Sequence, residues 1–124
     1  MVSSNRESAR AFVKESAGQR IPNMYRRGYT HEDIRSLGVK IEDTERLDQA
    51  EKTGVSATGF DSLVTDEMID AIFIAGEPED CLDRMIEVQG IAQSQGFKQL
   101  MFSKLEPDVD EALNLLCDVV IPAL

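Results

Sequence analysis

The sequence predicts an α/β protein that is mostly helical and has one clear strand, at about residues 97–102. Two observations lead to this fold class. Apolar residues recur at helical spacing along most of the chain, and glycine or proline interrupts the pattern at intervals. A single short apolar run, which ends at Phe102, is bounded by polar residues, as is typical of a buried parallel strand.

This predicted strand has no partner strand within the 124 residues. The backbone donors and acceptors of a lone strand would stay unsatisfied, so another strand must pair with it. One helix precedes the strand and another follows it, and helix–strand–helix is the terminal unit of a repeating α/β fold. We therefore expect a single partial domain whose neighbouring strands lie outside these 124 residues.

Residues 1–20 are expected to form the first helix. Ser4 and Glu7 have the spacing of a capping box, which would open this helix. Gly18 suits the helix end, and Pro22 follows as a helix breaker.

Residues 21–63 are expected to contain short helices and irregular segments. Thr30 would cap a short helix that ends at Gly38. A second, polar helix is predicted over residues 41–52, and residues 55–63 have the composition of a loop.

Residues 64–124 have the most regular pattern. Thr65 would cap a helix, and Gly76 would end it in a left-handed conformation. Pro78 fits the first position of the next helix, which Gly96 would end.

The final helix is predicted over about residues 108–120 and is apolar on more than one face. Pro122 would close its pattern. A helix that is apolar on several sides must be covered on several sides, either by the rest of a larger fold or by a second copy of the chain.

The formal net charge is −10, and the charge is unevenly distributed. Residues 1–40 carry eight basic and four acidic side chains, whereas residues 41–124 carry five basic and nineteen acidic ones. An acidic protein is poorly suited to nucleic acid, because phosphate neutralisation needs Lys and Arg. The basic first third either binds an anion or is a solvated helix face.

The remaining composition favours an acidic cytoplasmic protein without metal. No apolar run is long enough to span a membrane, and the N-terminus lacks the apolar core of a signal peptide. Cys81 and Cys117 lie in apolar helical patterns without a C-x-x-C motif, and His31 cannot complete a zinc site with them. We expect two reduced, structural cysteines.

From residue 64 onward the sequence resembles the C-terminal part of the luciferase-like monooxygenase superfamily, in particular its deazaflavin-dependent branch with the methylenetetrahydromethanopterin reductases. The resemblance is carried by these segments: Val64–Ala71, Ile74–Asp80, the strand to Phe102, and Val119–Leu124. Gly76-Glu77-Pro78-Glu79 stands where the family usually has Gly-Thr-Pro-Glu. The resemblance implies a (β/α)₈ TIM barrel, of which this chain is a C-terminal fragment. Residues 1–20 would be a barrel helix, residues 21–63 a variable helical insertion, and residues 64–124 the last helix–strand–helix unit of the barrel.

The resemblance also implies an oxidoreductase that uses coenzyme F420 or FMN, although neither is expected to bind tightly to this chain alone. Ser103 and Lys104 follow the strand, where barrel enzymes bind cofactors, and are the candidate cofactor-binding residues. Lys104 would pair with a phosphate, or is an ordinary solvated lysine. Tyr25, Arg26 and Arg27 are candidates for the substrate entrance, or belong to a surface insertion. No catalytic residue is assigned.

Two functions therefore remain open. In the first, the chain is part of an oxidoreductase, is inactive by itself, and has the remainder of the barrel as its partner. In the second, it is a small non-catalytic helical protein that acts through self-association or as a subunit.

Overall fold

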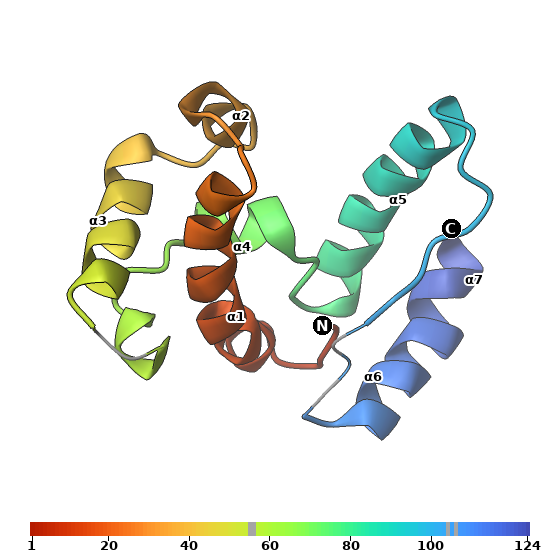
Figure 1. Cartoon of the computed structure of the whole chain (residues 1–124). Helices are drawn as coiled ribbons and strands as arrows, with labels where there is room; N and C mark the ends of the chain where they lie inside the picture. Colours follow the sequence, from red (N-terminus) through yellow and green to blue (C-terminus); the bar gives the residue numbers. More distant parts are fainter. Residues whose placement is uncertain (55–56, 104, 106) are drawn as a thin grey trace. The chain divides into compact units, whose positions relative to one another are not determined.

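The structure is a computed structural model that describes the chain except for residues 55–56, 104 and 106 (Figure 1). In the described part, helices follow one another and the only β structure is one isolated bridge. The chain divides into two compact units. Unit 1 combines Met1–Phe12 with Ile74–Leu124, and unit 2 consists of Val13–Phe73.

The first helix, α1 (Arg6–Arg26), begins in unit 1 and ends in unit 2. The predicted capping box of Ser4 and Glu7 is wrong. The side chain of Asn5 accepts a hydrogen bond from the backbone N–H three residues later, at 2.9 Å, and so caps the helix. Ser4 instead donates its backbone N–H and its hydroxyl to the carboxylate of Glu111, which ties the start of the chain to unit 1.

Helix α1 also continues through Gly18 and Pro22, where the sequence predicted an end and a break. Pro22 cannot donate to the carbonyl of Gly18, but Ile21 and Pro22 are both fully buried, and this packing outweighs the lost bond. Gly18 permits close packing instead of ending the helix. A Cβ atom there would lie 3.0 Å from a methyl of Val64 and 3.1 Å from Cβ of Phe60.

Unit 2 continues with α2 (His31–Ser36), α3 (Ile41–Lys52), a 3₁₀ turn η1 (Ala57–Phe60) and α4 (Asp66–Ile72). The predicted caps are confirmed. Thr30 forms a capping box with Asp33, and the Thr65 hydroxyl accepts from the N–H of Met68.

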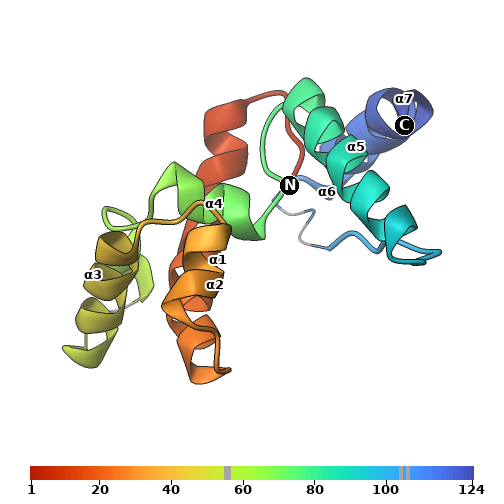
Figure 2. The same ribbon diagram turned by 90° about the horizontal axis from the view of Figure 1, so that it is seen from above.

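The second half of α1 and the length of α3 lie side by side within unit 2 (Figures 1 and 2). The core of the unit is formed by fully buried aliphatic side chains and a methionine: Val13, Ala17, Ile21, Ile34, Leu47, Met68 and Ile69. Each α-helix of the unit contributes side chains to this core. Their burial stabilises short helices such as α2 and α4, which would be unstable in isolation.

Unit 1 contains α5 (Pro78–Ser94), α6 (Val109–Leu115), the π-helical segment η2 (Leu116–Val120) and α7 (Ile121–Ala123). The predicted final helix is present, but it includes a π-helical segment that ends at Val120, two residues before Pro122. A proline cannot supply the regular i→i−4 bond, and a π-helical turn is one way to accommodate it.

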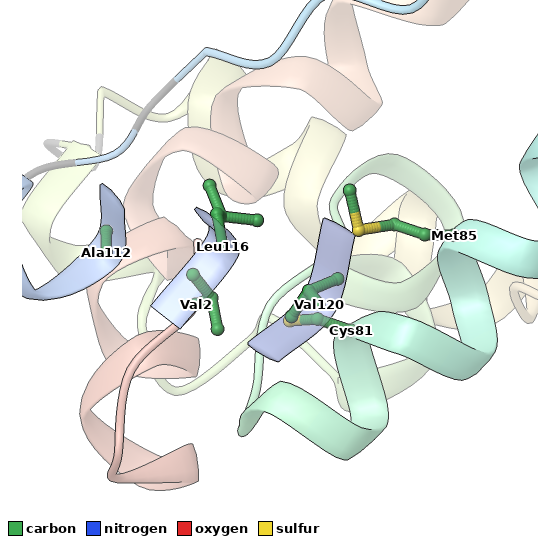
Figure 3. Packing of buried hydrophobic residues seen from close by; sticks show 6 residues of the cluster. All are labelled: Val2, Cys81, Met85, Ala112, Leu116 and Val120. Carbon is green, nitrogen blue, oxygen red and sulfur yellow. The ribbon is translucent and has the colours of Figure 1, made fainter. Parts of the chain in front are cut away.

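A small core holds unit 1 together (Figure 3). It is formed by side chains from the N-terminal segment, α5, α6 and η2: Val2, Cys81, Met85, Ala112, Leu116 and Val120. Cys81 is buried here, whereas Cys117 is exposed, so only the first cysteine has the structural position that the sequence indicated.

The isolated β-bridge joins Val2 to Gly76 in parallel orientation. The N–H of Ser3 donates to the Gly76 carbonyl at 3.1 Å, and the N–H of Gly76 donates to the Met1 carbonyl at 3.1 Å. The predicted left-handed conformation of Gly76 is therefore wrong. The glycine is needed for a close approach, since a Cβ atom there would lie 2.7 Å from a carboxylate oxygen of Asp80.

The predicted strand at residues 97–102 is also wrong for this chain. After the N–H of Phe97 closes the end of α5 on the Ala92 carbonyl at 2.9 Å, the described backbone up to Ser103 has no regular structure. Phe97 is 67% exposed and Met101 is 90% exposed. A strand requires a neighbour to pair its backbone, and no described segment of the chain pairs with this one.

Candidate functional site

Unit 2 contains a groove of about 610 Å³ along the C-terminal half of α1. One wall is a stripe formed by three residues of this helix and by the residue that follows it: Arg20, Asn23, Met24 and Arg27. These positions are three, four and seven residues apart, so they lie on the same face of the helix.

The end of α1 is closed by a left-handed glycine, which turns the chain back along the groove. Gly28 has a φ of 90°, and its N–H donates to the Tyr25 carbonyl at 3.0 Å. The N–H of Tyr29 donates to the Met24 carbonyl at 3.1 Å, which completes a Schellman motif. The motif places Tyr29 in the lining of the groove.

The other wall of the groove is apolar. Leu37 follows α2, and Ala71 and Ile72 form the last turn of α4. Tyr29 is 48% exposed and Leu37 is 40% exposed. The groove thus joins a basic side to an apolar side.

The arginines of the groove differ from the other arginines of unit 2. Three arginines outside the groove lining form ion pairs within the unit: Arg26 with Glu51, Arg35 with Glu32 and Arg46 with Asp43. The guanidinium of Arg20 lies over the Phe73 ring, 5.4 Å from its centre. Among the described residues, neither Arg20 nor Arg27 has a carboxylate partner.

The predicted substrate-entrance residues have three different environments. The Tyr25 hydroxyl lies 2.9 Å from the Thr44 hydroxyl, and its ring meets the His31 ring edge to face at 5.4 Å. Arg26 binds Glu51 and also donates to the side-chain carbonyl of Asn23. Arg27 lines the groove. The role of the three residues in a substrate entrance stays a prediction.

The predicted cofactor-binding residues lie in the other part of the chain. Ser103 is exposed at the end of the extended segment of unit 1. Lys104 lies outside the described residues. Their contact with a cofactor therefore also stays a prediction.

The titratable groups of unit 1 serve its structure. Burial raises the pKa of the Cys81 thiol, which therefore stays protonated and packs as an apolar group. Hydrogen bonds from Ser4 hold the pKa of the Glu111 carboxyl below its usual value, and the Arg6 guanidinium does the same for the pKa of Asp80.

Across the described ranges, no group of three or more His, Cys, Asp or Glu side chains is arranged to hold a metal ion. Within the same ranges, no helix is long and apolar enough to cross a membrane.

The sequence analysis missed Arg20, Asn23 and Met24 as groove residues. Their spacing with Arg27 was visible, but Pro22 interrupts it and was interpreted as a helix break. The stripe becomes meaningful only because α1 runs through Pro22. Two signals pointed to this region: the uneven charge and the basic residues Arg26 and Arg27, of which Arg27 lines the groove.

No protein-family model matches the chain. Its structure is similar to that of the coenzyme F420 dependent tetrahydromethanopterin reductase from Methanopyrus kandleri, with a TM-score of 0.75 and 24% sequence identity. The match covers 98% of this chain and 32% of that protein, so the chain spans about a third of the length of the enzyme it resembles. At this identity the likeness shows the fold alone: the chain is folded like one part of that enzyme.

Proposed function

We propose that this chain is the C-terminal part of a luciferase-like oxidoreductase, whose full-length form transfers hydride between coenzyme F420 or FMN and a small organic substrate. The observation that supports this most strongly is the extent of the structural likeness. Nearly the whole chain, 98%, aligns with 32% of an F420-dependent enzyme. An independent small fold would have no reason to match a partial domain so fully.

The exposed segment at residues 97–102 supports the same proposal from within the chain. Four apolar side chains of this segment are exposed: Phe97, Leu100, Met101 and Phe102. Such a sequence is typical of a buried parallel strand, and it remains unpaired here. A neighbouring strand from the remainder of a barrel would satisfy its backbone and cover its side chains.

The described residues around Ser103 do not form a fitting site for the cofactor. Ser103, the described residue assigned to cofactor binding, is exposed at the end of a segment without regular structure. A site for a flavin or deazaflavin ring needs walls on several sides. We therefore expect the 124-residue chain to bind F420 and FMN weakly or not at all, and we derive no reaction step from its residues.

The experiment compares two preparations. The isolated 124-residue chain and the native polypeptide, purified from its source cells through a C-terminal tag, are titrated with F420 and with FMN under fluorescence detection. The native polypeptide should bind one of them with saturation, and the isolated chain should not. Absence of saturable binding by the native polypeptide would contradict the proposal.

Self-association is the second candidate function, and the same exposed segment favours it. Two copies could pair residues 97–102 across a two-fold axis and bury these side chains against each other. Sedimentation velocity at several concentrations would reveal the dimer, and Met101→Lys should weaken it. A monomer at all concentrations would exclude this function.

A further inference from the structure

We propose that the groove of unit 2 is a binding site for a small phosphomonoester with an apolar body. Both walls of the groove belong to this chain, and all of its lining residues lie in unit 2. The inference therefore does not depend on the proposed oxidoreductase function.

The two arginines that line the groove indicate the kind of anion it would bind. Arg20 lies on α1 and Arg27 directly follows the helix, and this spacing of seven residues separates their Cα atoms by roughly 10 Å at the rise of a helix. Both side chains are exposed and have no carboxylate partner among the described residues. Two guanidinium groups match the charge of a phosphomonoester, which approaches −2 at neutral pH.

Asn23 lies between the two arginines on the same face and lines the groove. Its side-chain carbonyl accepts a hydrogen bond from Arg26, which fixes the orientation of the amide. The amide NH₂ group then remains as a donor for a phosphate oxygen. Arg26 is thus a positioning residue, because its ion pair with Glu51 holds it in place.

The apolar wall identifies the other half of the ligand. Tyr29 and Leu37 are the two large apolar side chains of unit 2 that are most exposed, and both line the groove. Met24 and Ile72 extend the same surface. Side chains of this kind favour an aromatic or aliphatic group, which would cover them on binding.

The net charge of the protein makes nonspecific anion binding unfavourable. At −10, the chain repels anions except where cations are concentrated and free of acidic partners. The groove is such a place, because the other arginines of the unit are neutralised by ion pairs.

The test is a titration of the 124-residue chain with phenyl phosphate, followed by ¹H–¹⁵N NMR. The amide signals of residues 20–29 should shift with saturation. Inorganic phosphate, which lacks the ring, and phenol, which lacks the charge, should each bind at least about tenfold more weakly. Binding should also weaken as the pH falls below about 6, where the phosphate takes up a proton.

The variants Arg20→Gln and Arg27→Gln should each weaken phenyl phosphate binding about tenfold, and Arg27→Lys should recover part of the loss. The matched controls Arg35→Gln and Arg46→Gln remove the same charge outside the groove and should change the affinity less than about twofold. Far-UV circular dichroism shows that each variant is folded. The proposal is overturned if the wild type shows no saturable shift, or if the control variants weaken binding as much as Arg27→Gln.

Discussion

The two units of this chain differ in how completely they cover their own apolar side chains. Thirteen large hydrophobic residues are exposed in the described part, and eleven of them lie in unit 1. The two that belong to unit 2, Tyr29 and Leu37, both line its groove. Among the described residues, unit 2 exposes large apolar side chains only at its groove, whereas unit 1 exposes many of them, as we expect of a domain that lacks a neighbour.

The two units also differ in their hydrogen bonds and ion pairs. Unit 2 neutralises most of its arginines internally and caps α2 and α4 with threonine side chains. Unit 1 concentrates its long-range polar contacts at the N-terminal segment, where Ser4 binds Glu111 and Arg6 binds Asp80. Its apolar segment at residues 97–102 forms no such side-chain contact with the other described residues. We expect a partial domain to combine an anchored N-terminal segment with an uncovered apolar segment of this kind.

The largest difference between the units should appear on truncation of an apolar side chain. Leu47→Ala, in the core of unit 2, should lower the free energy of unfolding by about 2–5 kcal/mol, because it leaves a cavity around a fully buried position. Ile91→Ala, on α5 of unit 1, should change it by less than about 0.5 kcal/mol, because Ile91 is 57% exposed. Urea denaturation of both variants measures the two values. Equal losses would show that Ile91 is covered in solution.

A second prediction concerns Gly76 of unit 1, where the β-bridge to Val2 precedes the start of α5. Gly76→Ala should cost about 1–3 kcal/mol, since the added Cβ displaces the Asp80 side chain and with it the hydrogen bond to the N–H of Glu77. Gly90→Ala, within α5, meets no atom within 4 Å and should raise stability by up to about 1 kcal/mol. Thermal denaturation distinguishes the two. A neutral Gly76→Ala would contradict the close approach.

The corrected helix cap gives a third, smaller effect. Asn5→Ala should cost about 1 kcal/mol, because it removes the acceptor for the first turn of α1. Glu7→Ala should have almost no effect, since the predicted capping box is absent. If urea denaturation showed the reverse order, the original prediction of the box would be restored.

The smallest effect is a dependence on pH in unit 1. Hydrogen bonds from Ser4, assisted by Ser3, hold the pKa of Glu111 below its ordinary value of 4.5. The stabilisation is therefore fully present above about pH 4.5 and is lost as the pH falls through the lower, folded-state pKa. Glu111→Gln should remove this pH dependence, and Ser4→Ala should reduce it. Denaturation midpoints measured at several values between about pH 3 and pH 6, a range that brackets the ordinary carboxyl pKa, would give the slope of stability against pH. Identical slopes in all three proteins would contradict the link.

The sequence predicted the features that depend on neighbouring residues. Thr30, Thr65 and Pro78 start their helices as expected, because caps are set within a single turn. The mostly helical content and the likeness to a part of a luciferase-like fold were also predicted.

The sequence predictions are wrong where contacts between residues far apart in the sequence determine the local structure. Helix α1 continues through Pro22 because Ile21 and Pro22 are buried in unit 2. Gly76 does not adopt the left-handed conformation because its backbone forms the bridge to Val2. The groove escaped prediction for the same reason, since its stripe exists only on an uninterrupted helix. The strand at residues 97–102 needs a partner, and its apolar pattern could not show that the described chain supplies none.

The mass of the native polypeptide tests most directly whether unit 1 lacks its neighbour. An antibody raised against residues 107–124 detects the polypeptide in an extract of its source cells, separated under denaturing conditions. We predict a band well above 13.8 kDa, because the remaining strands of the barrel would belong to the same polypeptide. A band at 13.8 kDa would contradict the proposed function, and self-association through residues 97–102 would then explain the exposed segment.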